Sequence, residues 1–311
     1  MDWYTQLDET IQTHLPDLVW LCDEPMSRHT SFRIGGPARR MACPKNGEQL
    51  VLLWSFAESL GLRPLVIGNG TNLLAPDGGL DRLVIDTSAA MTRLEAGEDP
   101  CVLTAEAGVS LARLADAACK QGLTGLEFAH GIPGTVGGAV CMNAGAYGGE
   151  MAQVVERVDA LFPGEGVRSL TREELGFAYR CSLFTDRPEV TVLRASFRLT
   201  PGDGEAVRRR MRELLERRKQ SQPLEWPSAG STFKRPQGYF AGTLIDQCGL
   251  KGLTVGGAQV SEKHAGFVIN RFDATSADVE ALIREIQDRV LEKTGVRLEP
   301  EVRILRREGG A

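Results

Sequence analysis

The sequence of 311 residues is 42% hydrophobic and 25% charged, with a net charge of −5, which is typical of a soluble globular protein of two or three domains. The mild negative charge argues against general binding to nucleic acid or anionic membranes, and no apolar run approaches the length of a membrane span. The N-terminus lacks the features of a signal peptide, and seven cysteines and four histidines are scattered without metal-ligand spacing. We therefore expect a cytoplasmic protein with no metal site.

The first half of the chain reads as small α/β units. Residues 1–30 are predicted as a short helix and an irregular entry, and Thr30 to Ala38 as a strand that runs into a Gly-Gly-Pro turn. One helix is predicted from Asn46 to Leu60, and another begins after a capping Ser110 and ends at Gly122. Short strands are predicted at 63–68, 83–86, 102–107, 154–162 and 190–199.

The second half begins with Pro201-Gly-Asp-Gly204, which reads as a domain boundary. A basic amphipathic helix is predicted from Glu205 to Gln220, a second long helix from Ser276 to Lys293, and a closing strand over 296–305. A basic run usually forms a solvated helix face. The last turn of the basic helix, Arg217 to Lys219, precedes a proline-rich segment, so one of its charges could face an anionic ligand.

Two glycine-rich stretches dominate the sequence. The longer, Gly131 to Gly149, has seven glycines in nineteen residues and no charged residue, and the shorter, Gly68-Asn-Gly-Thr-Asn-Leu-Leu74, follows an apolar strand. The backbone N–H groups of such loops can cradle a pyrophosphate, although a tightly packed turn has the same composition. The shorter stretch has neither the Walker nor the Rossmann pattern. Two such loops on neighbouring small domains could hold the two ends of a dinucleotide.

Three further segments contain candidate chemical groups. Arg180 lies in a mostly apolar stretch, where a guanidinium needs either an ion-pair partner or a ligand. The glycine before Ser231 lets the backbone approach a substrate, and that serine could protonate only a strongly basic carbon in a preorganised pocket; the alternative is a simple turn. Glu299 and Glu301 share one face of the predicted closing strand. Either one of these carboxylates points into a cleft as an acid, or both lie on a solvated edge.

Six motifs occur in order along the chain: Thr30–Gly36, Gly68–Leu74, Gly131–Gly138 with Met142–Gly148, Tyr179–Ser182, Ala229–Lys234 and Glu301–Arg303. Together they resemble UDP-N-acetylenolpyruvoylglucosamine reductase, a flavoenzyme family of bacterial peptidoglycan synthesis. Each motif alone is unspecific, whereas the ordered set, which covers 30–305, is highly specific. The resemblance implies a mixed α/β (α+β) flavoprotein of three domains. Two are FAD-binding subdomains of the vanillyl-alcohol-oxidase (PCMH-type) class, at 1–80 with the C-terminal strand 297–311 and at 81–200, and the third is a substrate-binding α/β domain at 201–296.

The resemblance also assigns residues to the cofactor and to the substrate. Non-covalent FAD would be held by the first motif and the two glycine loops, through Arg33, Gly68, Asn69, Gly70, Thr71, Asn72, Leu73, Gly131, Ile132, Pro133, Gly134, Thr135, Gly137, Gly138, Asn143, Gly145 and Ala146. The substrate, UDP-N-acetylglucosamine enolpyruvate, would contact Lys219, Lys234, Arg235 and Gln247. Covalent attachment of FAD through a histidine such as His130 is not a property of this family.

The implied reaction is the NADPH-dependent reduction of that substrate to UDP-N-acetylmuramate. NADPH reduces the FAD, and flavin N5 then gives hydride to the vinyl carbon. Arg180 and Glu301 match the residues that stabilise the resulting enediolate, and Ser231 matches the residue that protonates it. Glu301 would have to be protonated or hydrogen-bonded near the substrate carboxylate, because a second free anion would repel it.

The sequence departs from the family pattern in two places, and two other functions are considered as alternatives. The interval between Arg180 and Lys219 is too short for the extra loop that brings a tyrosine over the substrate in one branch, so the chain resembles the loop-less (type II) branch. Arg235 stands where many members have Asn. A nucleotide-binding module without a redox role would not need Arg180, Ser231 and Glu301 together, and another oxidoreductase of this flavin fold would not need the third-domain motif. No obligate protein partner is implied.

Overall fold

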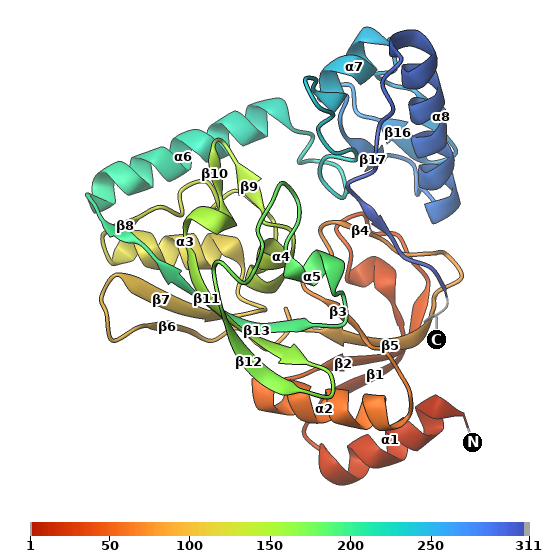
Figure 1. Ribbon diagram of the computed structural model, residues 1–311. Coiled ribbons are helices and arrows are strands. Elements are labelled where there is room, and N and C mark those ends of the chain that lie inside the picture. Colours follow the sequence, from red (N-terminus) through yellow and green to blue (C-terminus); the bar gives the residue numbers. More distant parts are fainter. Residues whose placement is uncertain (1, 308–311) are drawn as a thin grey trace.

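A four-stranded sheet covered by two helices forms the first unit of the structure (Figure 1), a computed structural model that describes residues 2–307. The strands, in spatial order, are β1 (Val19–Pro25), β2 (Pro37–Cys43), β5 (Leu80–Asp86) and β3 (Leu65–Ile67). The first pair is antiparallel and the other two pairs are parallel. The helices are α1 (Trp3–His14) and α2 (Gly47–Ser59), and a 3-10 turn, η1, covers Met26–Arg28.

The predicted helix at 46–60 is confirmed as α2. Its cap is Asn46, whose side-chain oxygen accepts a hydrogen bond of 2.9 Å from the backbone N–H of Gln49. Its apolar face is buried against α1 and the first sheet, through Leu50, Leu53, Trp54 and Ala57.

An antiparallel five-stranded sheet forms the second unit. Its spatial order is β12 (Gly166–Thr171), β11 (Val155–Phe162), β13 (Thr191–Arg198), β7 (Val102–Glu106) and β6 (Leu94–Ala96). Its helices are α3 (Leu111–Lys120), α4 (Val136–Cys141), α5 (Leu183–Asp186) and α6 (Gly204–Ser221). Its short pairs are β8 (Leu123–Thr124) with β14 (Thr200–Pro201) and β9 (Gly145–Ala146) with β10 (Gly149–Glu150), followed by η2 (Met151–Gln153).

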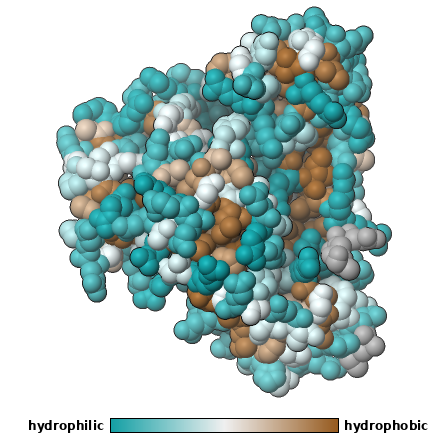
Figure 2. Space-filling model, in the orientation of Figure 1, coloured by the Kyte–Doolittle hydropathy of each residue, from teal (hydrophilic) through white to brown (hydrophobic). Residues whose placement is uncertain are grey.

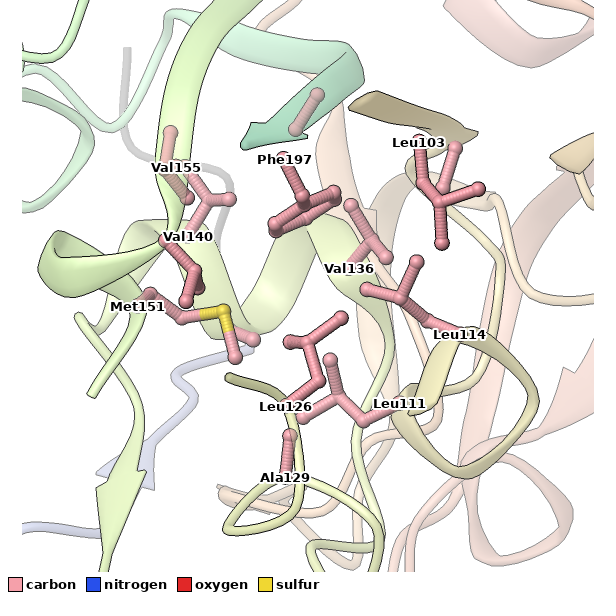
Figure 3. Packing of buried hydrophobic residues seen from close by; sticks show 14 of the residues in the cluster. Leu103, Leu111, Leu114, Leu126, Ala129, Val136, Val140, Met151, Val155 and Phe197 are labelled. Carbon is pink, nitrogen blue, oxygen red and sulfur yellow. The ribbon is translucent and has the colours of Figure 1, made fainter. Parts of the chain in front are cut away.

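The core of the second unit supports the long glycine stretch. Val136 and Val140 project from α4, which is formed by this stretch, toward Phe197 of β13, and Leu114 of α3 lies beside them (Figure 3). These side chains are fully buried. The long glycine stretch is therefore held in place by this buried core and is not a flexible linker.

The basic helix α6 also packs on the second unit. Asp203 caps it by accepting a hydrogen bond from the N–H of Glu205, and Val207 and Met211 join the core that includes α3 and β8. The chain therefore leaves this core at the end of α6, after Ser221, and not at the predicted boundary of 201–204.

The third unit is a three-stranded antiparallel sheet with two helices, at the upper right of Figure 1. It contains α7 (Ala241–Gln247), β15 (Thr254–Val255), β16 (Ala258–Val260), β17 (Val268–Asn270) and α8 (Ser276–Thr294). The predicted helix at 276–293 is confirmed as α8, which Thr275 caps and which ends at Gly295 with φ +71°. The chain then returns to the first unit, where β18 (Arg303–Ile304) pairs in parallel with β4 (Leu73–Leu74).

Three predictions about the positions of strands are wrong. Residues 19–25 form strand β1 instead of an irregular entry. The segment Thr30 to Gly36 is not a strand, because Arg33 and Gly35 have φ of +56° and +131° and turn it past residues 75–79. The closing strand is limited to β18, and before it Pro300 forms only an isolated antiparallel bridge with Phe233.

The surface contains hydrophobic residues toward the middle of one face, between the third unit and the rest of the molecule, while hydrophilic residues dominate its edges (Figure 2). Within residues 2–307, no helix is long and apolar enough to cross a membrane. The same part of the chain holds no group of three or more His, Cys, Asp or Glu residues arranged for a metal ion.

Candidate functional site

The two glycine-rich stretches face one another across a cavity of about 320 Å³, here called the main cavity. The predicted cofactor residues that line it are Gly68, Asn69, Gly70, Thr71, Asn72, Leu73, Ile132, Pro133, Gly134, Thr135, Gly137, Gly138, Gly145 and Ala146. The two stretches belong to different units, so the main cavity lies between the first and second units. Six of the predicted residues that line it are glycines, which let backbone come close to a phosphate group.

Glycine is required where the first loop meets its neighbours. A side-chain carbon on Gly68 would overlap Thr135 Oγ1 of the second loop and would lie 3.1 Å from Thr135 Cβ and Cγ2. Gly70 has φ +57°, and a side-chain carbon there would overlap the carbonyl of His29. The loops are thus in contact, and the first one is fixed from both sides.

The predicted trio Arg180, Ser231 and Glu301 lies together at one end of the main cavity. Arg180 Nε donates to Glu301 Oε1 at 2.7 Å, and the two side chains are 24% and 12% exposed. A guanidinium nitrogen of Arg180 also reaches the carbonyl of Gly145 at 3.5 Å. The arginine therefore has its ion-pair partner and still has donors free for a ligand.

A tight turn presents Arg180 to the cavity. Ala178 and Cys181 exchange backbone hydrogen bonds, and Arg180 between them has φ +54°, a conformation that is uncommon for residues other than glycine and is concentrated at functional sites. Asn143 is buried and donates to the carbonyl of Ala178 at 3.0 Å. The long glycine stretch thus positions the turn that carries the arginine.

The backbone of Thr232 joins Ser231 to Glu301. The carbonyl of Thr232 accepts the N–H of Glu301 at 2.8 Å, and its own N–H donates to the carbonyl of Gly266 at 2.8 Å. No side-chain hydrogen bond is formed by Ser231 with any described residue from 2 to 307, and its side chain is exposed to the cavity. Its hydroxyl is therefore available to a ligand.

Burial raises the pKa of the Glu301 carboxyl, and the nearby Arg180 guanidinium opposes that rise. Desolvation disfavours the ionised form, so the proton is held more tightly than in water. In contrast, Glu299 is exposed and interacts with Lys234 at 3.5 Å. Only one of the two predicted carboxylates thus points into the cavity.

A second cavity of about 420 Å³, here called the adjoining cavity, shares Arg180, Ser231 and Glu301 with the first. Its wall on the third unit carries the cations Arg235, Lys251 and Lys263 and the carboxylate of Asp246. Lys251 pairs with Asp246 at 2.7 Å and Lys263 with Glu225 at 3.7 Å. The guanidinium of Arg235 stacks 4.0 Å from the ring centre of Phe240, and its backbone N–H donates to the hydroxyl of Tyr179 at 3.1 Å. The wall is thus suited to an anionic group attached to a planar ring.

Six predicted site residues do not line either cavity: Arg33, Gly131, Asn143, Lys219, Lys234 and Gln247. Lys219 pairs with Glu216 at 2.7 Å on the solvent face of α6, and Gln247 is exposed at the end of α7. Arg33 is exposed in the turn before β2. His130, rejected as an attachment point, interacts with Asp116 at 3.4 Å and lines neither cavity.

Among the charged and amide side chains that line the main cavity, sequence reasoning missed three: Arg218, Gln222 and Arg303. The buried residues of α6 are Val207, Met211 and Leu214, and the same helical spacing leads next to Arg218. Continuing the apolar stripe would therefore have selected Arg218 instead of Lys219 as the charge that faces a ligand.

Family models match both halves of this architecture. The description "UDP-N-acetylenolpyruvoylglucosamine reductase, C-terminal domain" matches 222–305, and "FAD binding domain" matches 38–170. The UDP-N-acetylenolpyruvoylglucosamine reductase of Agathobacter rectalis is 47% identical over 96% of this chain and 97% of its own. The chain belongs to the UDP-N-acetylenolpyruvoylglucosamine reductase family. That of Caldanaerobacter subterraneus subsp. tengcongensis is 48% identical over 91% and 92% of the two chains.

A solved structure of this family has the same fold. The UDP-N-acetylenolpyruvylglucosamine reductase of Thermus caldophilus superposes with a TM-score of 0.77 and 36% identity, over 92% of this chain and 98% of that one. The expected three-part flavoprotein architecture is therefore confirmed at the level of the fold. FAD also fits the main cavity, because glycine backbone lines its wall and Arg218 Nε is a buried donor with no partner among residues 2–307.

Proposed function

We propose that this protein reduces UDP-N-acetylglucosamine enolpyruvate to UDP-N-acetylmuramate, with FAD bound non-covalently in the main cavity and NADPH as the reductant. One observation carries the proposal: Arg180, Ser231 and Glu301 line both cavities. They lie between a wall suited to a dinucleotide and a wall where three cations outnumber the single carboxylate of Asp246, which suits a second, anionic ligand. A nucleotide-binding module without chemistry has no need for an acid and a guanidinium at that junction.

FAD would be held by the backbone of 68–73 and 132–146, and when bound it would supply the hydride. Arg180 keeps donors free beside its bond to Glu301 and would bind the carboxylate of the enolpyruvyl group. Burial raises the pKa of Glu301 and so makes its protonated form more accessible than in water, and in that form it would donate a hydrogen bond to the same carboxylate without repelling it. The two groups would stabilise the enediolate form that develops there.

Ser231 Oγ would then protonate the carbon next to the carboxylate. An enediolate is basic enough to take a proton from a serine in a preorganised site. The exposed hydroxyl of Ser231 would regain its proton from water, since no described side chain accepts from it.

The substrate nucleotide would lie in the adjoining cavity, near Arg235, Lys251 and Lys263. Lys219 and Gln247, which the resemblance assigns to the substrate, are less suited to that role because they point to solvent. Ten residues, 181–190, separate Arg180 from Thr191, the first residue of β13, so this chain fits the loop-less branch. We propose that Tyr179 and Phe240 cover the nucleotide instead.

We propose that 1–80 with 297–311 and 81–221 hold FAD and that 222–296 forms the substrate domain. The packing of α6 on the second unit and the start of the C-terminal family model at 222 support a boundary later than 201. We further propose that the protein acts in the cytoplasm on a small-molecule substrate and without an obligate protein partner.

A visible spectrum of the purified protein tests this function. We expect a flavin band that bleaches with NADPH under anaerobic conditions and returns when UDP-N-acetylglucosamine enolpyruvate is added. Bleaching without return would reject this substrate, and failure to bind FAD at all would reject the cofactor. Acid precipitation should release the yellow colour into the supernatant, whereas a yellow pellet would contradict non-covalent binding.

A further inference from the structure

Arg218 lies where the apolar stripe of α6 leaves the protein core. Val207, Met211 and Leu214 on the same stripe are buried in the second unit, and the next position, Arg218, lines the main cavity. The stem of its side chain rests on the long glycine stretch, because a side-chain carbon on Gly131 would lie 3.4 Å from Arg218 Cδ. The helix thus directs this guanidinium toward the cavity instead of toward solvent.

Arg218 has no partner within the described part of the chain. Its Nε is buried without a hydrogen bond, and no carboxylate from 2 to 307 forms an ion pair with it. Its neighbours on the helix differ, since Arg217 pairs with Glu213 at 2.7 Å and Lys219 pairs with Glu216. Arg218 is only partly exposed, and a guanidinium that is partly desolvated and has no ion-pair partner is unfavourable unless a ligand compensates it.

Gln222 provides a second unpartnered atom on the same side. It follows Arg218 by four residues, its backbone N–H donates to the carbonyl of Arg218, and it lines the main cavity. Its Oε1 is buried without a partner. The pair therefore offers a donor that needs an anionic acceptor and, beside it, an acceptor that needs a hydroxyl or another donor.

The charge of the main cavity agrees with this requirement. Arg180, Arg218 and Arg303 line it, and Glu301, which is paired with Arg180, is the one carboxylate among the described lining residues. The excess is therefore two positive charges when Glu301 is ionised and three when it is protonated. A diphosphate diester carries two negative charges at neutral pH, and guanidinium groups bind phosphate through charge-assisted hydrogen bonds.

We propose that Arg218 and Gln222 form a clamp on the diphosphate of FAD, with the guanidinium on phosphate oxygens and Gln222 Oε1 on a neighbouring sugar or ribityl hydroxyl. The clamp rests on the proposed function. The substrate has a diphosphate of the same chemistry, but the adjoining cavity has its own cations, Arg235, Lys251 and Lys263. Because Gln222 begins the segment that enters the third unit, FAD binding would also fix the direction of that entry.

The test measures flavin affinity with the full-length chain, stripped of flavin and titrated with FAD or with riboflavin, which lacks phosphate. Arg218→Met removes the charge at similar volume, and Arg217→Met is the matched control on the solvent face. We expect Arg218→Met to weaken FAD binding about 10- to 100-fold and to leave riboflavin binding unchanged. Arg217→Met should bind both as the original protein does, and Arg218→Lys should recover part of the FAD affinity.

Three results would overturn the clamp. Equal loss of FAD and riboflavin affinity in Arg218→Met would assign the residue to packing. Unchanged FAD affinity with a raised KM for the enolpyruvyl substrate would assign it to the substrate diphosphate. Failure of the original protein to bind FAD would instead remove the proposed function as a whole, so the two failures are distinguishable. Circular dichroism and thermal unfolding of each variant check that it folds.

Discussion

The substitution Gly68→Ala tests whether the close contact between the two glycine stretches determines the shape of the main cavity. The new methyl group would overlap Thr135 Oγ1 and lie 3.1 Å from Thr135 Cβ and Cγ2, where ordinary contacts are 3.4–4 Å. Thr135 is buried, so the loops must move apart. Overpacking of this kind costs about 1–3 kcal/mol.

The cost can appear in two measurements. If the loops stay together, the free energy of unfolding in urea falls by about 1–3 kcal/mol. If they separate, the cavity changes shape and FAD affinity falls by about 5- to 150-fold, since 1.4 kcal/mol is a factor of ten. Gly78→Ala is the matched control, because a side-chain carbon there meets nothing within 4 Å, and we expect it to change neither quantity appreciably.

The double variant Gly68→Ala/Thr135→Ala decides whether the clash is the cause. Removing Oγ1 and Cγ2 leaves the Cβ atom of residue 135 at 3.1 Å, so the rescue should be large but incomplete. Thr135 makes no side-chain cap bond to α4, so Thr135→Ala should have little effect on that helix. A double variant as impaired as the sum of its single changes would refute the steric argument.

Three further predictions concern the junction of the cavities. Glu301→Gln should gain stability relative to the original protein as the pH rises above the ordinary glutamate range. The raised pKa of Glu301 in the fold means that ionisation removes stability there, and equal pH profiles in thermal unfolding would contradict this. Ser231→Ala should lower kcat about 100- to 10,000-fold, while bleaching of the flavin by NADPH, measured in a stopped-flow instrument, stays unchanged; slowed bleaching would argue against a role in protonation. Asn143→Ala removes buried hydrogen bonds to Ala178 and Ala152. It should lower the free energy of unfolding by about 2–4 kcal/mol. A loss below about 0.5 kcal/mol, the effect of a typical surface substitution, would show that the turn at Arg180 does not depend on Asn143.

Local signals in the sequence predicted the long helices well. Asn46, Ser110, Thr275 and Gly295 mark helix ends by capping and by a left-handed residue, which depend only on nearby atoms. Thr30 to Gly36 was misread because its alternating pattern resembles a strand, whereas its turn is set by residues 75–79, far along the chain. Local pattern cannot report a contact of that kind.

The candidate site likewise combines features that local sequence predicts with features that depend on contacts between distant residues. Glycine composition was sufficient to predict the two loops, but the bond between Arg180 and Glu301 joins residues 121 positions apart, which no spacing rule connects. Only the resemblance brought them together. Lys219 was assigned to the substrate by the resemblance, yet the orientation of α6 directs Arg218 inward, and this orientation depends on the apolar stripe beneath it.

Asn72 explains why the end of the chain completes the site. Its side-chain amide donates to the carbonyl of Glu301 at 3.0 Å, across 229 positions, and its own carbonyl accepts the N–H of Arg303 at 2.9 Å. Asn72 also lines the main cavity as part of the first glycine loop. The loop expected to hold the cofactor therefore fixes the backbone that carries the acid, while the second unit supplies Arg180 and the third supplies Ser231. Since no single unit contains the complete set, the proposed catalysis would require all three to be docked, and a shift of any one of them would separate the groups proposed to act together.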